Sequence, residues 1–76
     1  MKNIQTLALN NSIARTIKLA NIYKDNDAEM YKIFAEQLHE EVIIKAKIDI
    51  GQTLTQLEQI HIEAVTNQFK LEVAES

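Results

Sequence analysis

The two histidines of this 76-residue chain each follow a glutamate by three residues, in two copies of the motif Glu-x-x-His. The first copy is Glu36 with His39, and the second is Glu58 with His61. Side chains three residues apart project from one face of a helix, so each pair could bind the same metal ion. If the chain turns back at Gly51, the two motifs come within about two helical turns of each other. The sequence therefore permits one site of two carboxylates and two imidazoles.

The paired motifs resemble those of the ferritin-like di-iron carboxylate proteins. Those bundles use Glu-x-x-His on each of two helices and a lone glutamate on each of the other two. The resemblance implies Glu36, His39, Glu58 and His61 as the metal ligands, and it covers only these two short motifs. Residues 13–24 carry no Asp or Glu, so the remaining carboxylates would have to come from elsewhere in the chain or from a second subunit. A simpler zinc site would also fit these ligands.

A structural role is the favoured interpretation of the same histidines. His39 and His61 each follow an apolar residue expected in the core, Leu38 and Ile60, and lie about 100° further round the helix. Glu, Gln and His at such boundary positions form side-chain pairs worth a few tenths of a kcal/mol. We therefore predict no cofactor, and we keep a divalent metal such as iron, manganese or zinc as the alternative.

The composition favours an all-α protein. Proline is absent, glycine occurs once, and the absence of cysteine means that disulfides cannot support the fold. A single domain of this size rarely gains more than about 3–5 kcal/mol from its own core. The predicted fold is a small antiparallel helical bundle, of three helices or of one helix and a long helical hairpin, completed by oligomerisation.

Apolar periodicity predicts three helices within one domain. Their expected ranges are 12–24, 27–49 and 54–73, and residues 1–10 and 74–76 are expected to be mobile. The polar residues Asn10, Asn11 and Ser12 are typical of the cap of a first helix. Asp27 or Asn26 is expected to cap the second helix. Thr55 has the capping-box spacing to a glutamate three residues later, which predicts the start of the third.

Residues 42–50 fit two kinds of secondary structure. Their alternation of apolar and polar residues is typical of a half-buried strand. A strand would need partners that the rest of the chain hardly offers, so we favour a helix. Gly51 and the capping residues after it favour a break between the second and third helices.

Apolar residues outnumber the positions that a three-helix core can bury. Ile44, Ile48 and Ile62 lie off the main apolar stripes and are expected to be exposed in a monomer, which indicates an oligomer interface. Tyr31 and Phe34 are expected to pack together or to anchor a partner. We therefore predict a non-catalytic protein that works by protein–protein interaction, with itself or with another protein, as a regulator, adaptor, inhibitor or assembly factor.

The net charge of −3 is unevenly distributed. Residues 1–24 carry four of the eight basic residues and none of the eleven acidic ones. A face formed by Arg15, Lys18 and Lys24 could bind nucleic acid, but so few charges make a weak phosphate-binding surface. Packing of this basic segment against acidic helices is the favoured interpretation. No apolar run could span a bilayer and no secretory signal is visible, so a cytoplasmic protein without a membrane partner is expected.

Overall fold

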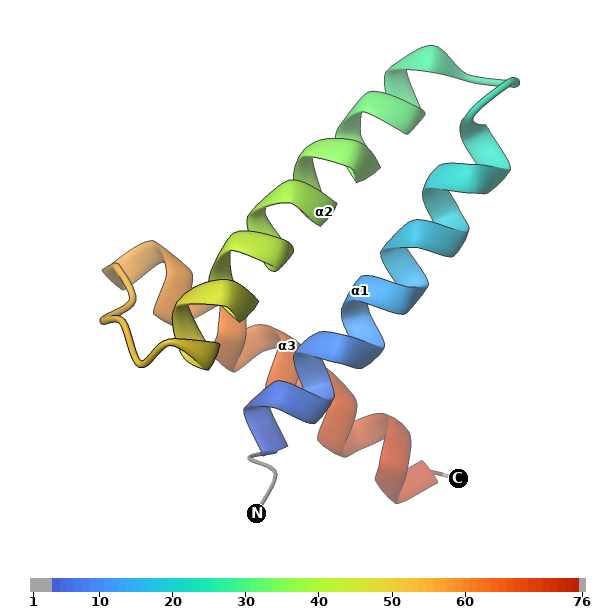
Figure 1. Cartoon of the computed structure of the whole chain (residues 1–76). Helices are drawn as coiled ribbons and strands as arrows, with labels where there is room; N and C mark the ends of the chain where they lie inside the picture. The colour runs from blue at the N-terminus through green and yellow to red at the C-terminus, as the bar shows by residue number, and fades with distance from the viewer. Residues whose placement is uncertain (1–3, 76) are drawn as a thin grey trace.

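The computed structural model describes residues 4–75, which form three helices, α1 (Ile4–Tyr23), α2 (Ala28–Asp49) and α3 (Gln56–Glu75). α1 and α2 form an antiparallel hairpin, and α3 crosses the hairpin behind α1 in the view of Figure 1. The described residues contain no strand, so the all-α prediction is confirmed. None of the helices in this part of the chain combines the length and the apolar character needed to cross a bilayer.

A short polar turn joins α1 to α2. The backbone N–H groups of Asn26 and Asp27 both donate to Tyr23 O, at 3.1 and 3.0 Å. The Asp27 carboxylate then accepts from the N–H of Met30 at 3.1 Å and so caps α2. These bonds satisfy terminal groups of both helices that would otherwise lack partners. The predicted Asp27 cap is therefore confirmed.

α2 ends at the single glycine of the chain. Gly51 has a φ of +73°, in the left-handed region where glycine avoids the steric cost of a Cβ atom. Its N–H donates to Ile48 O at 3.2 Å, and the next residue, Gln52, donates to Lys47 O at 2.8 Å. These are the two hydrogen bonds of a Schellman cap. Residues 42–49 are thus helical, and Gly51 separates α2 from α3, as expected.

α3 begins with the predicted capping box. The N–H of Thr55 donates to Glu58 Oε1 at 2.9 Å, and the N–H of Glu58 donates to Thr55 Oγ1 at 3.2 Å. The reciprocal bonds satisfy two donors at the start of the helix. α3 then continues to Glu75, two residues past the expected end.

α1 begins earlier than the sequence indicated. It starts at Ile4, so the predicted cap at Asn10, Asn11 and Ser12 is wrong. Ser12 is buried within the helix, and the Asn11 amide donates to Glu72 of α3 at 3.1 Å. Contacts with α3 thus outweigh the tendency of these polar residues to end helices. Residues 4–10 and 74–75 are helical, and residues 1–3 and 76 lie outside the part of the chain that the structure describes.

The core lies where the three helices meet. It consists of Leu9, Ile44 and Ile62, with Ile13, Ile48 and Leu54 packed against it. The prediction that Ile44 and Ile62 would be exposed in a monomer is wrong, because each is only 2% exposed. Ile48 likewise packs against this core rather than standing free. The reason is that α3 crosses the hairpin, which places these residues between helices.

Several large apolar residues are exposed, and one of them, Ile60, was expected in the core. They are Ile17 and Ile22 of α1, Ile33 and Val42 of α2, and Leu57, Ile60 and Leu71 of α3. On α1 the buried positions are filled mainly by smaller side chains, including Ala8, Ser12, Thr16 and Ala20. The apolar stripes read from the sequence therefore do not coincide with the interior of the single chain.

Phe34 makes an aromatic contact across the hairpin. Phe34 stacks on Tyr23 of α1, with ring centroids 5.7 Å apart and planes inclined by 14°. Tyr31 is exposed on α2. Offset stacking at this separation is a favourable aromatic geometry, and it joins α1 and α2 near their turn.

Candidate interaction groove

The structure does not assemble the predicted cluster of four metal ligands. Among residues 4–75, no group of three or more histidine, aspartate and glutamate side chains is arranged to hold a metal ion. Glu36, His39 and His61 line one open hollow of about 730 Å³, but Glu58 does not. The expected meeting required α3 to run back along α2 from Gly51, whereas α3 crosses towards α1. Metal binding by these residues stays a prediction.

His61 lies at the junction of the three helices. It lines the hollow just described, a second of about 590 Å³ between α2 and α3, and a third of about 340 Å³ that includes Ser12 and Thr16 of α1. Its Nε2 atom is buried and has no hydrogen-bond partner in the structure. The His61 imidazole thus lines three neighbouring hollows. The Glu-x-x-His motif alone did not indicate this position.

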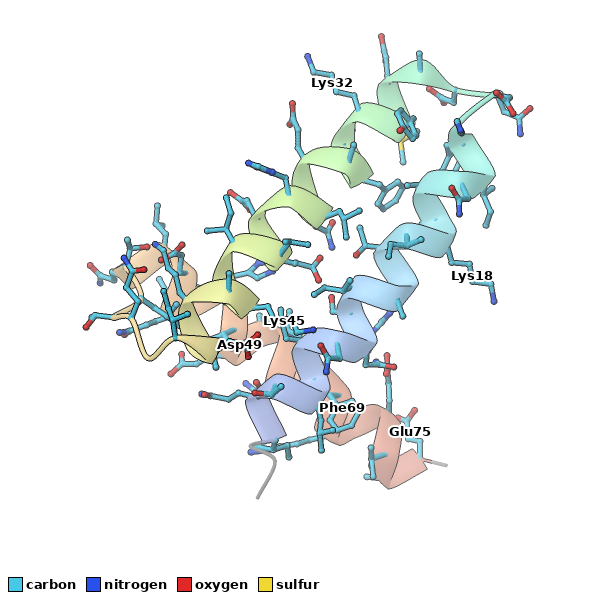
Figure 2. All side chains as sticks on the ribbon, viewed as in Figure 1. Lys18, Lys32, Lys45, Asp49, Phe69 and Glu75 are labelled. Atoms are coloured by element: carbon cyan, nitrogen blue, oxygen red, sulfur yellow. The ribbon has the colours of Figure 1, made fainter. Side chains whose placement is uncertain are left out.

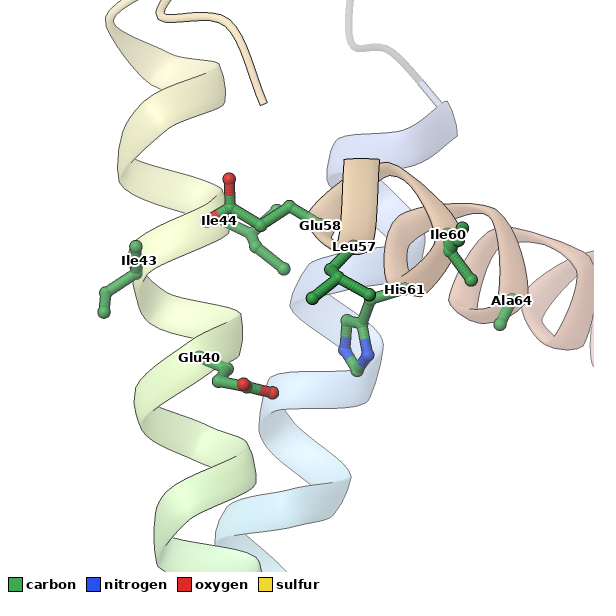
Figure 3. A pocket seen from close by; sticks show the side chains of 8 residues that line it. All are labelled: Glu40, Ile43, Ile44, Leu57, Glu58, Ile60, His61 and Ala64. Carbon is green, nitrogen blue, oxygen red and sulfur yellow. The ribbon is translucent and has the colours of Figure 1, made fainter. Parts of the chain in front are cut away.

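The hollow of about 590 Å³ is lined by more aliphatic residues than either of the other two, and we call it the α2–α3 groove. Its apolar lining is Ile43 and Ile44 of α2 and Leu57, Ile60 and Ala64 of α3, and Glu40, Glu58 and His61 complete it. Figure 3 shows Glu40 extending from α2 towards the His61 imidazole on α3. The groove thus combines apolar walls with a polar region that contains a carboxylate and an imidazole.

Two glutamates on one side of α3 hold it against the hairpin. Glu58 accepts from the Lys47 ammonium at 2.8 and 2.9 Å, which joins α3 to α2. Glu72 pairs with Arg15 at 2.9 Å, which joins α3 to α1. Because the two glutamates are fourteen residues apart, or four helical turns, they lie on the same side of the helix. The two ion pairs therefore lie on the side of α3 that faces the hairpin, which also places Ile62 in the core.

The Lys47 contact also changes the acidity of Glu58. Hydrogen bonds from the Lys47 ammonium, and then from the backbone N–H of Thr55, lower the pKa of Glu58 below its ordinary value. Removal from water acts in the opposite direction but is the weaker influence. Glu58 is thus committed to ion pairing and helix capping in this structure rather than free to bind a metal.

The buried polar cluster that lies between α1 and α2 was not predicted from the sequence. Glu41 is fully buried, and its Oε1 accepts from Thr16 Oγ1 and from Gln37 Nε2, both at 3.0 Å. Its Oε2 has no hydrogen-bond partner in the structure. Its position in the sequence could have indicated the burial of Glu41, because Glu41 lies on the side of α2 that carries Phe34 and Ile44.

The basic residues of the N-terminal segment differ in their surroundings. Arg15 is paired with Glu72, in line with the expected packing of a basic helix against an acidic one. Lys18 points away from the bundle in Figure 2, and Lys24 is exposed at the turn. A nucleic-acid surface would therefore have to include a side chain that already has an acidic partner, and this alternative stays a prediction.

Comparisons with models of protein families, with curated protein sequences and with solved structures found no match in any of the three.

Proposed function

We propose that this chain is a small non-catalytic protein that acts by binding an amphipathic helix along the α2–α3 groove. The observation that carries the proposal is the exposure of adjacent large aliphatic side chains at this groove. Leu57 is 80% exposed and Ile60 is 56% exposed, beside the partly exposed Ile43 of α2. Scattered apolar residues are normal on protein surfaces, whereas a contiguous patch marks a binding surface.

The exposed groove residues Leu57 and Ile60 are not part of the core of the single chain. That core is formed by Leu9, Ile44 and Ile62, and the side of α3 that contacts it also carries the paired Glu58. Leu57 and Ile60 lie on another side of the same helix. Leu57 and Ile60 therefore add little to the stability of the monomer, whereas a bound partner that covers them would remove their apolar area from water.

The shape of the groove favours a helix as its occupant. It lies between two helices, and its apolar residues on α3 are spaced three and four residues apart, at Leu57, Ile60 and Ala64. Helices bind such grooves through apolar side chains at matching intervals. Glu40 is exposed and offers a carboxylate at one side, which would suit a polar residue at the edge of the bound helix.

Site-specific photo-crosslinking in cells that produce the protein tests this proposal. A photoreactive phenylalanine analogue at Ile60 is expected to capture a protein, while the same group at the outward-pointing Lys18 captures none. Introducing Ile43→Glu in the Ile60-labelled chain should abolish the product, because a carboxylate would be buried in the groove. Equal labelling from positions 60 and 18, or no product from position 60, would rule out the groove as a binding surface.

A further inference from the structure

α3 carries two stripes of residues rather than one. The inner stripe faces the hairpin and contains the buried or half-buried residues Glu58, Ile62, Val65, Phe69 and Glu72. The outer stripe consists of Leu57, Ile60, Ala64, Asn67, Leu71 and Ala74, and all six are exposed. Successive members of the outer stripe alternate between three and four residues apart from one end of α3 to the other.

This spacing is that of a coiled-coil seam. An apolar repeat of 3.5 residues keeps one side of a helix against a second helix along its whole length. Leu57 and Ile60 begin the outer stripe, and Leu71, which is 59% exposed, continues it at the far end. Since the inner stripe already binds the hairpin, the outer stripe remains available for a second helix.

We propose that the outer stripe binds the outer stripe of a second copy of this chain, with the two α3 helices antiparallel. The inference rests on the proposed function and specifies it, because the helix that enters the α2–α3 groove is then α3 of another molecule. Two copies related by a two-fold axis present the same stripe to each other, as an isologous interface requires.

The side chains match in the antiparallel arrangement. When the two α3 helices overlap over their whole length, residue 57 of one copy is level with residue 74 of the other. In the same way residue 60 is level with residue 71, and residue 64 with residue 67. Leu57 then lies against Ala74 of the second copy, and Ile60 lies against Leu71. Ala64 lies against Asn67 at the centre, where the two Asn67 amides are close to the axis. Aliphatic side chains thus face one another at two of the three levels, and their contact would remove apolar area from water.

The charges beside the stripe also match. Glu63 and Lys70 are both exposed and flank the outer stripe on the same edge. In the antiparallel pair, residue 63 of one copy is level with residue 68 of the other. Glu63 of each copy therefore lies only two residues from the level of the other copy's Lys70. Opposite charges at such flanking positions favour a particular partner and orientation.

The groove would be filled by the same contact. The level pairing places Leu71 of the second copy against Ile60, which lines the α2–α3 groove together with Ile43. The C-terminal half of one α3 thus covers the groove of the other molecule, and the reverse. The seam and the groove are therefore parts of one continuous surface.

Sedimentation equilibrium from low micromolar to near-millimolar concentration tests the dimer. The wild-type chain is expected to pass from monomer to dimer. Ile60→Glu should weaken association by about a hundredfold or more, because each dimer would bury two carboxylates among apolar side chains. Gln59→Glu is the matched control, since it adds the same charge at an exposed neighbour off the stripe and should dimerise normally. Leu71→Glu is a second variant, and circular dichroism verifies that each variant is folded.

The chain contains no cysteine, so introduced cysteines report orientation directly. A mixture of Leu57→Cys and Ala74→Cys chains should form a mixed disulfide on mild oxidation, while each variant alone forms little dimer. Disulfide formation by each variant alone, without the mixed product, would overturn the antiparallel arrangement.

The two proposals fail in different ways. A wild-type chain that is monomeric at every concentration overturns the dimer, as does an Ile60→Glu chain that dimerises like Gln59→Glu. If the photo-crosslinked product from position 60 then has the mass of the chain plus a different protein, the groove proposal stands and only the second copy is excluded. If position 60 captures nothing, both proposals fail.

Discussion

The space between α1 and α2 and the outer side of α3 distribute their polar and apolar residues in opposite ways. The first buries Ser12, Thr16 and Glu41, whereas the second exposes Leu57, Ile60 and Leu71. A hydroxyl or a carboxylate in an interior is tolerated when it is hydrogen-bonded, and aliphatic side chains gain free energy when they leave water. The difference indicates that the interior of the hairpin aligns two helices, and that the apolar side of α3 is suited to a further contact.

The polar interior selects one alignment of the hairpin. Thr16 bonds Glu41 and Tyr23 stacks on Phe34, and both pairs of residue numbers sum to 57. A slip of one helical turn would take Thr16 away from the buried Glu41 carboxyl group and leave Gln37, on the same helix, as its donor. Because the loss of a hydrogen bond to a buried polar group is costly, the cluster opposes other registers more strongly than a uniformly apolar surface would.

The comparison is tested most strongly by truncating one aliphatic residue in each region. Ile44→Ala should lower the free energy of unfolding by about 2–5 kcal/mol, because it leaves a cavity in the core. Leu57→Ala should cost less than about 0.5 kcal/mol in dilute monomer, because that side chain is already in water. Urea denaturation at low micromolar concentration measures both. Equal losses would mean that Leu57 belongs to the fold and that the outer stripe is not free.

The second test concerns the buried carboxylate. Thr16→Val keeps the side-chain shape but removes a hydroxyl that lies 3.0 Å from Glu41 Oε1, and it should cost about 1–3 kcal/mol. Glu41→Met removes the charge itself and should be neutral or stabilising, as replacements of buried ionic groups often are. In the double variant, Thr16→Val should cost much less than it does alone. Thermal and urea denaturation of the four chains give this cycle, and additive effects would contradict the coupling of Thr16 to Glu41.

Local signals in the sequence predicted the helix ends at the two turns. Asp27, Gly51 and Thr55 each act on backbone groups within a few residues, so their identities and spacing are sufficient. The start of α1 was mispredicted because Asn11 is held by Glu72, which is 61 residues away in the chain. A contact between residues so far apart cannot be predicted from the residues around Asn11.

The inner sides of the helices could not be predicted in the same way. α3 has two stripes with the same three- and four-residue spacing, and periodicity alone does not determine which one the hairpin covers. The choice depends on contacts between helices: Ile62 packs in the core, and Lys47 and Arg15 bind Glu58 and Glu72. For the same reason the candidate metal residues were correctly recognised as helical but wrongly brought together.

A smaller effect is expected at the turn that directs α3 across the hairpin. Gly51→Ala should destabilise the chain by roughly 1–2 kcal/mol, because a Cβ is unfavourable at a φ of +73° although no atom lies in its way. Gly51→Asn should cost less, since asparagine tolerates this conformation better. Urea denaturation distinguishes them. Equal stability of the alanine variant and the wild type would contradict the Schellman cap.

The smallest effect on stability is expected from the ion pair between Lys47 and Glu58. The folded state lowers the pKa of Glu58 from 4.5, so the stability that this carboxylate adds is present above about pH 4.5 and is lost as the pH falls through the lowered pKa. Glu58→Gln keeps a side chain suited to the capping box but removes the charge. The wild type should therefore be the more stable of the two at neutral pH, and the difference should shrink on acidification.

Lys47→Met supplies the control for that titration. The hydrogen bond from Lys47 is the largest cause of the lowered pKa, so this variant should raise the pKa of Glu58 towards its ordinary value. NMR titration of the Glu58 carboxyl carbon measures the shift, and Arg15→Met should leave it unchanged because Arg15 pairs with Glu72. An unchanged Glu58 pKa in Lys47→Met would mean that Lys47 does not pair with Glu58 in solution. The orientation of Leu57 and Ile60 would then depend on the packing of Ile62 in the core and on the pair of Arg15 with Glu72.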